Sequence, residues 1–162
     1  MRLLLAVAAL GALTTAAVAA PWANNEVHFD DDSSAYIAYQ FSSASGDYTL
    51  EYECDSGWQL DTFTVQTAEA YDQAASYPTS VPTQFIVDDG APVELTGVFQ
   101  DRSGYLVAFY ESYDAFDEYG AVLDAIEAAK SSIRVKFLDH DVAFSAEGVS
   151  EALAVATVPC YS

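Results

Sequence analysis

Residues 47–54 read DYTLEYEC, and their side chains alternate between two classes. One face of an extended chain would carry Tyr48, Leu50, Tyr52 and Cys54, and the other would carry Thr49, Glu51 and Glu53. A period of two with one apolar face predicts a half-buried β-strand. Similar stretches occur on both sides of it, so this strand sets the frame of the predicted fold.

Seven further stretches predict strands, because they are rich in β-branched and aromatic residues. They are residues 35–41, 58–67, 83–87, 92–100, 105–110, 132–138 and 142–145. Within 58–67 the apolar residues change parity after Leu60, which predicts a bulge near Asp61 and Thr62. Asp88-Asp89-Gly90 predicts a tight hairpin turn. Residues 68–82 are rich in Pro, Ser and Ala and predict a long loop.

Two helices are expected. Residues 112–130 predict the main helix, because an apolar stripe recurs there at spacings of three and four, formed by Phe116, Tyr119, Leu123 and Ile126. Residues 148–158 predict a short C-terminal helix that leads to Cys160. Gly148 precedes this helix, where we expect a positive φ or close packing that a Cβ would prevent.

Strands precede the main helix instead of alternating with helices. We therefore predict an α+β fold with a mostly antiparallel sheet of seven to eight strands.

The first residues have the pattern of a secretory signal peptide. Arg2 supplies a positive charge, residues 3–13 are apolar, and Ala17-Val18-Ala19 fits the small-residue cleavage rule. We predict a signal peptide over 1–19, an extended N-terminal arm over 20–34 and a single domain over 35–162. The mature protein is then periplasmic or secreted, with no membrane span after cleavage, since the apolar run is too short to remain as an anchor.

The chain contains two cysteines, Cys54 and Cys160, and export would carry both into an oxidising compartment. Disulfides persist in oxidising compartments, so we expect these two residues to be bonded to each other.

The charge balance restricts the possible partners. The chain has 25 acidic residues and five Lys or Arg, a formal charge of −20. This argues against nucleic acid, because phosphate binding needs clustered cations. Three explanations of the acidity stay open: a hydration coat for salty surroundings, complementarity to a cationic partner, and affinity for divalent ions. Arg134 and Lys136 share a strand face, where we expect them to neutralise adjacent acids.

No catalytic motif stands out. The sequence contains no G-x-S-x-G elbow and no glycine-rich phosphate loop, so we predict a protein without enzymatic activity and without a cofactor. No metal site is predicted. Weak calcium ligands, which offer hard carboxylate oxygens, are Asp30, Asp31, Asp32, Asp88, Asp89, Asp139 and Asp141.

The order of the motifs resembles a group of exported bacterial proteins. It runs from the strand with Cys54, through the Asp88-Asp89-Gly90 hairpin and the acidic-starting helix, to FSAEGVSEAL (144–153) and Cys160. This order is similar to the periplasmic accessory protein of type VI secretion and to invasion-associated locus B proteins. YECDSG (52–57) also resembles the opening of periplasmic lysozyme inhibitors.

These resemblances imply an accessory role in secretion or in the cell envelope, exercised by binding another envelope protein. The alternatives are an acidic inhibitor of a cationic cell-wall hydrolase and a calcium-binding exported domain. The oligomeric state stays open.

Overall fold

The computed structural model describes residues 20–28, 34–41, 47–57, 60–112 and 116–161. In chain order the elements are β1 (Ala23–His28), β2 (Ser34–Phe41), β3 (Thr49–Asp55), β4 (Leu60–Ala70), β5 (Val81–Val87), β6 (Val93–Arg102), β7 (Tyr105–Glu111), α1 (Phe116–Glu127), β8 (Ser132–Phe137), β9 (His140–Ser145) and α2 (Val149–Tyr161).

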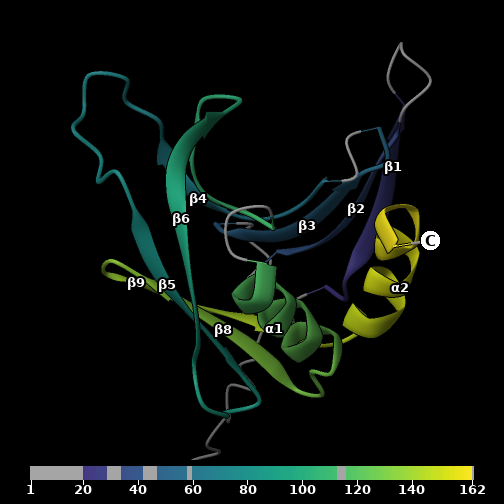
Figure 1. The fold of residues 1–162 in the computed structure, drawn as a ribbon. Helices are drawn as coiled ribbons and strands as arrows, with labels where there is room; N and C mark the ends of the chain where they lie inside the picture. Colours follow the sequence, from purple (N-terminus) through teal and green to yellow (C-terminus); the bar gives the residue numbers. More distant parts are fainter. Residues whose placement is uncertain (1–19, 29–33, 42–46, 58–59, 113–115, 162) are drawn as a thin grey trace, which may run out of the picture.

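The nine described strands form one sheet in the order β1-β2-β3-β4-β7-β6-β5-β8-β9, and every pair is antiparallel. The strand β6 belongs to both halves of this sheet. Its first part, up to Gly97, pairs with β5, and its second part, from Val98, pairs with β7. The sheet bends there, so that β1 to β4 lie above β5, β8 and β9 in Figure 1.

Gly97 is required at this bend because β6 and β7 approach each other closely. A Cβ built on Gly97 would lie 2.3 Å from the carbonyl oxygen of Phe109 and 2.5 Å from the ring of Tyr110. Glycine is the residue that tolerates such a close backbone approach. The bend allows the two halves of the sheet to face a common core.

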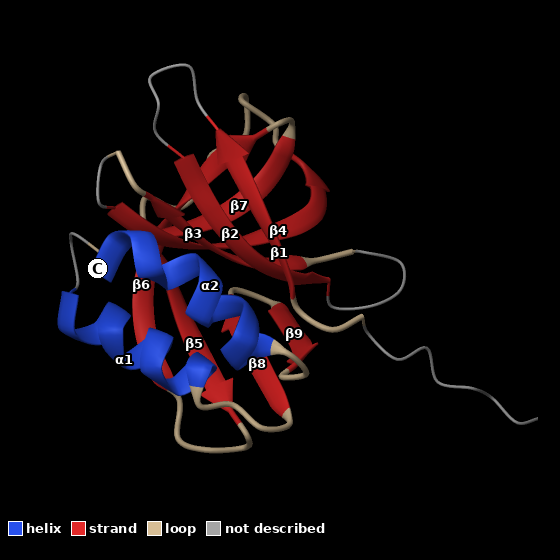
Figure 2. Ribbon diagram, turned by 90° about the vertical axis from the view of Figure 1, so that its right-hand side faces the viewer, coloured by secondary structure: helices blue, strands red, loops and turns tan. Residues whose placement is uncertain are grey.

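The helices lie in the opening of the bent sheet, and Figure 2 shows α1 and α2 side by side. The core between sheet and helices is aromatic. Phe63 lies 5.4 Å from Tyr52, 5.1 Å from Tyr119 and 6.1 Å from Phe85, measured between ring centroids. Neither described helix is long and apolar enough to cross a membrane.

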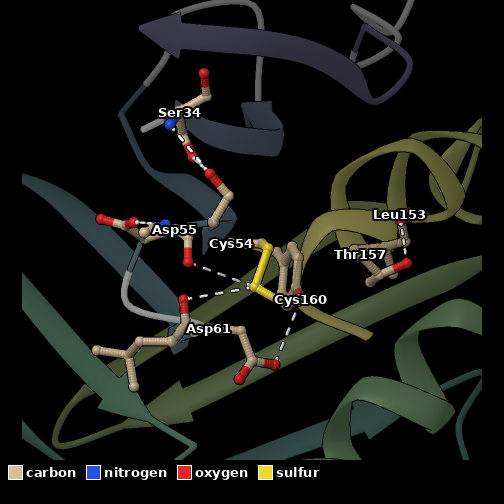
Figure 3. The surroundings of a disulfide bond; sticks show 11 residues. Ser34, Cys54, Asp55, Asp61, Leu153, Thr157 and Cys160 are labelled. Carbon is tan, nitrogen blue, oxygen red and sulfur yellow. Dashed lines mark hydrogen bonds between the residues drawn. A yellow bond between two sulfur atoms is a disulfide. The ribbon is translucent and has the colours of Figure 1, made fainter. Parts of the chain in front are cut away.

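The disulfide predicted from the sequence is confirmed. Cys54 of β3 is bonded to Cys160 of α2, with the two Cα atoms 6.0 Å apart (Figure 3). The two cysteines are 106 residues apart in the sequence. The bond therefore ties the C-terminal helix to β3, the third strand of the sheet.

Residues 20–28 belong to the domain, which corrects the prediction of a separate N-terminal arm. Trp22 is only 6% exposed, and its indole Nε1 donates a hydrogen bond to the carbonyl of Ser145 at 2.8 Å. Residues 23–28 pair with β2 as an edge strand. An aromatic side chain as large as Trp22 stabilises the fold when it is buried. The acidic part of the predicted arm, Asp30 to Asp32, lies outside the described residues.

The α+β class and the mostly antiparallel sheet are confirmed, and so is the alternation of 49–55, with its even-numbered residues in the core. The described sheet has nine strands, more than the seven to eight predicted, because β1 adds one. The predicted bulge near Asp61 is wrong, since β3 and β4 pair without interruption there. The register shift of β4 lies between Gln66 and Ala70 instead.

The turn residues fit their positions. Asp88 and Asp89 have φ values of 49° and 58°, and the N–H of Gly90 donates to the carbonyl of Val87 at 2.8 Å, so a tight turn forms there. The connection between β5 and β6 is longer than the predicted tight hairpin, because the last pair of the two strands is Phe85 with Val93. Gly148 has a φ of 79°, and a Cβ on it would lie 3.6 Å from the backbone of Trp22. The positive φ expected of Gly148 is therefore confirmed, whereas its distance from Trp22 is an ordinary van der Waals contact that a Cβ would not prevent.

Candidate functional site

The strongest candidate site is a groove on the outer face of the sheet, the face turned away from α1 and α2. Strand register brings one row of side chains together across it. Tyr39, Glu51, Thr64, Phe109 and Val98 are successive partners on β2, β3, β4, β7 and β6. Because cross-strand partners point to the same side of a sheet, these side chains share the outer face. In Figure 1, β6 and β1 stand at the two sides of this part of the sheet.

Three pockets open on this face, and together they are called the outer groove here. The first two share lining residues, whereas the third has lining residues of its own. The first has a volume of about 340 Å³ and lies between Glu53 and Arg102. The second, of about 410 Å³, shares Gln100 and Phe109 with the first and extends along β6. The third, of about 370 Å³, extends to β1 and includes Glu51.

An ion cluster occupies the middle of the groove. The guanidinium of Arg102, on β6, donates one hydrogen bond to Glu51 and another, of 3.0 Å, to Glu53. A third bond, of 3.3 Å, goes to the hydroxyl of Thr64. Glu51 and Glu53 are two residues apart on β3, so the pleat of the strand points both carboxylates at the same cation.

Burial changes the electrostatics of this cluster. It raises the pKa of the Glu51 carboxyl, and the opposite charge of Arg102 counteracts part of this rise. Neighbouring side chains cover part of this outer face, since Thr64, which contacts Arg102, is 2% exposed and Val107 is 1% exposed. A charged group that entered the groove would thus meet carboxylates that are less screened by water than those elsewhere on the surface.

The lining of the groove combines negative charge with apolar surface. Five carboxylates and one guanidinium line the three pockets, a formal charge of −4: Glu51, Glu53, Asp55, Asp101 and Glu111, with Arg102. Between them lie Leu60, Phe109 and Val98, of which Val98 is 41% exposed. Such a surface complements a ligand that carries both positive charges and apolar side chains.

The structure separates the acidic residues that the sequence offered as weak calcium ligands. Asp88 accepts a hydrogen bond from the Ser131 hydroxyl at 2.7 Å and others from the backbone of Lys130, Ser131 and Ser132, at 2.8, 2.7 and 3.0 Å, and these bonds hold its pKa far below the usual range. Asp89 occupies the same turn. Asp30 to Asp32 lie outside the described residues.

The other two candidate ligands lie at the β8–β9 hairpin. Asp141 accepts hydrogen bonds from Arg134, which lower its pKa, and it lies 3.6 Å from Lys136. Both cations thus neutralise an adjacent acid, as their shared strand face predicted. Asp139 lies 3.8 Å from the His140 ring. No group of three or more His, Cys, Asp or Glu side chains in the described part of the chain could hold a metal ion.

His140 connects the two halves of the sheet. Its ring stacks on Phe137 at 4.6 Å between centroids, and its Nδ1 lies 3.0 Å from the hydroxyl of Tyr48. Tyr48 directly precedes β3, so this contact joins the β8–β9 hairpin to the half of the sheet that carries the groove. The sequence had placed His140 only between the predicted strands 132–138 and 142–145.

Sequence reasoning missed two residues of the groove. Arg102 lies between the predicted strands 92–100 and 105–110, and the sequence carries no signal that it reaches Glu51. Leu60 was taken with Trp58 as evidence for a bulge. In the structure Leu60 is the apolar member of the outer face of β4, which it shares with Thr62 and Thr64. An apolar residue among the otherwise polar, outward-facing positions of a strand was the signal that could have indicated a binding surface.

Comparisons with known proteins found no match to this chain among protein-family models, curated proteins or solved structures.

Proposed function

We propose that this chain is a non-enzymatic, exported binding module whose outer groove takes a basic, partly apolar segment of another envelope protein. The observation that carries the proposal is the groove itself, with a formal charge of −4 around an apolar floor. A cationic partner is attracted by this field before it makes contact, and its apolar side chains are desolvated once it is bound.

The dimensions of the groove favour an extended segment. The groove crosses six neighbouring strands of the sheet, in the order β1, β2, β3, β4, β7 and β6. A spacing of ~4.8 Å between neighbouring strands gives the groove a length of about 24 Å. At ~3.4 Å per residue this length accommodates about seven residues of extended chain. A peptide of this length could place its basic residues beside Glu53 and Glu111 and its apolar residues on Leu60 and Phe109.

Export is supported by two independent features. Residues 1–19 have the composition of a signal peptide, with a basic start, an apolar centre and small residues at the end. The bond between Cys54 and Cys160 is of a kind that persists in oxidising compartments and is rare in the cytosol. The resemblance to exported accessory proteins of the envelope agrees with the proposed compartment.

A second candidate is inhibition of a cationic cell-wall hydrolase. The observation that favours it is the position of Glu53 and Asp55, which flank Cys54 in the stretch that resembles lysozyme inhibitors. Both line the first pocket of the groove. In this case the occupant would be a basic loop of the enzyme. A lysozyme assay at low salt tests this candidate, and unchanged lysozyme activity at low salt rejects it.

The binding proposal is tested with a fluorescent eight-residue peptide of alternating Lys and Leu, and with a Glu–Leu peptide of the same length. We expect the Lys–Leu peptide to bind and the Glu–Leu peptide not to bind. Added salt should weaken the affinity, because charge attraction between exposed groups is screened.

The decisive variant is Glu53→Gln with Glu111→Gln, compared with Glu118→Gln and Glu127→Gln. Both pairs remove two negative charges, but Glu118 and Glu127 are exposed on α1, on the other side of the sheet. The groove variant should bind at least tenfold more weakly, since hydrogen bonds to charged groups contribute about 1.5–3 kcal/mol. The α1 variant should bind almost as the wild type does. An equal loss in both variants would contradict the assignment to the groove.

A further inference from the structure

One buried polar atom of the described chain is left without a hydrogen-bond partner close to the predicted cleavage site. Gln40, on the core side of β2, is 1% exposed. Its amide Nε2 donates a hydrogen bond of 2.8 Å to the carbonyl of Ala20, while its Oε1 has no hydrogen-bond partner. Buried acceptors of this kind are rare in native structures, because an unmade hydrogen bond costs free energy.

The chain around Ala20 is held firmly in place. The backbone N–H of Trp22 donates to the carbonyl of Glu147 at 2.9 Å, and the side chain of Asn24 donates to the carbonyl of Ala152 at 2.7 Å. These partners lie more than 120 residues further along the sequence. They fix the position of Ala20 relative to Gln40.

The backbone donors beside Gln40 can be counted. Pro21 has no N–H, and the N–H of Trp22 is already used by Glu147. Among residues 20–22, elimination leaves the nitrogen of Ala20, the residue whose carbonyl Gln40 already contacts. A side-chain amide offers a donor and an acceptor side by side, so one Gln can contact both the carbonyl and the nitrogen of a single residue.

We propose that Gln40 is a receptor for the N-terminal ammonium group that is created when the signal peptide is cleaved after Ala19. This inference rests on the export part of the proposed function. In the cleavage, water is added across the Ala19–Ala20 peptide bond by an envelope peptidase. Ala19 leaves as a carboxylate, and the nitrogen of Ala20 becomes an ammonium group at neutral pH.

Cleavage changes what Ala20 can offer to Gln40. A peptide nitrogen has one hydrogen in a fixed plane, whereas an ammonium group has three donors that rotate freely and carry a charge. Hydrogen bonds to a charged donor are roughly twice as strong as those between neutral groups. Processing would thus satisfy Gln40 Oε1 and anchor the first residue of the mature chain beside β2, which completes the edge of the domain.

The test uses the chain as it is exported, and its first step is intact mass. Mass analysis should show a first residue of Ala20. The second step measures how fast an activated acetyl ester acylates the Ala20 amine, with Lys130 and Lys136 as internal references. We expect acylation in the native protein to be about tenfold slower than in the same protein unfolded in urea, a ratio that requires no variant to fold.

Two variants separate the receptor role from general packing. Gln40→Met keeps the size and the burial but has no acceptor, so acylation of Ala20 should become about tenfold faster. Gln40→Glu keeps an acceptor for the ammonium group, so acylation should stay slow.

The possible outcomes separate the receptor role of Gln40 from export of the protein. A chain that starts at Ala20 but is acylated equally fast in the native wild type and in urea overturns the receptor role and leaves export standing. A chain that starts elsewhere, or keeps residues 1–19, overturns both. Peptide binding in the outer groove is a separate readout, so its failure would not be confused with either result.

Discussion

The guanidinium of Arg102 contacts the carboxylate of Glu51, which lies 51 residues earlier in the sequence. The two side chains meet because β4 and β7 place β3 and β6 on one outer face. Arg102 is 39% exposed and Glu51 is 18% exposed, measured on the side chains, so water screens this pair only in part. It is the centre of the outer groove, and its electrostatics can be tested directly.

Replacing Arg102 with methionine should destabilise the fold in a pH-dependent way. We expect a loss of about 1–2 kcal/mol at pH 7.5, between the values typical of exposed and of buried pairs. Burial already raises the pKa of Glu51, and it would rise further without the cation. A carboxyl whose pKa is raised in the folded state binds its proton more tightly there than in the unfolded chain. The loss of stability caused by Arg102→Met should therefore shrink as the pH falls from neutral through the folded pKa of Glu51.

Urea unfolding at pH 7.5 and pH 5 measures this effect. Lys130→Met is the matched control, because Lys130 is an exposed residue outside the groove. A loss for Arg102→Met that is independent of pH would contradict the proposed role of Glu51.

Asp88→Asn should lower the thermal midpoint at neutral pH. The carboxylate of Asp88 accepts hydrogen bonds from the Ser131 hydroxyl and from three backbone N–H groups, which lower its pKa. A carboxyl whose pKa is lower in the folded state than in the unfolded chain stabilises the fold at any pH above its unfolded pKa of about 3.9. This stabilisation is lost as the pH falls through the pKa of the folded state.

The difference between wild type and Asp88→Asn should therefore be constant from pH 7 to pH 5 and shrink below about pH 4. Scanning calorimetry across this range is the measurement. Asp89→Asn controls for the turn, because Asp89 has a similar φ of 58°. If both variants behave alike, the hydrogen bonds of Asp88 do not contribute as stated.

Removing the disulfide should reduce stability strongly. The bond links residues 106 apart, and the chain-entropy model assigns a loop of that size at most ~4–5 kcal/mol. We expect the double variant Cys54→Ala, Cys160→Ala to lose a large part of this amount in guanidinium unfolding. A loss below about 1 kcal/mol would show that α2 is held to the sheet mainly by its apolar contacts.

Gly97→Ala should destabilise the bend of β6, because the added Cβ would overlap the backbone of Phe109 and the ring of Tyr110. Overpacking in a buried site costs about 1–3 kcal/mol. Gly120→Ala in α1 is the opposite control, since nothing lies within 4 Å of a Cβ added there. That change should stabilise the helix by roughly 0.5–1 kcal/mol. Opposite signs in thermal melting would verify both statements.

Local patterns predicted much of the fold. The alternation around Cys54 gave the strand and its buried face, and the helical stripe placed Tyr119, Leu123 and Ile126 in the core. The Asp88-Asp89 turn and the positive φ of Gly148 followed from backbone preferences alone. Each of these features depends on neighbours within a few residues, which is why one sequence was enough to find it.

The candidate site could not be predicted in the same way. Leu60 looked like a core residue out of register, and Trp22 lay in the segment predicted to be an extended N-terminal arm. Both errors come from assigning a residue to core or surface by local composition. The place of each residue depends on partners far along the sequence, such as Ser145 for Trp22.

The sequence by itself determined the strands, the helices, the turn chemistry, the acidic charge and the expectation of a disulfide, because short-range periodicity and composition encode these properties. Only the tertiary structure decided that Arg102 meets Glu51 and Glu53, that β7 approaches Gly97 too closely for a Cβ, and that Gln40 lies beside Ala20. The physical reason is that these contacts depend on strand order and register across the whole sheet. Strand order is set by the packing of the complete core, which no single segment specifies.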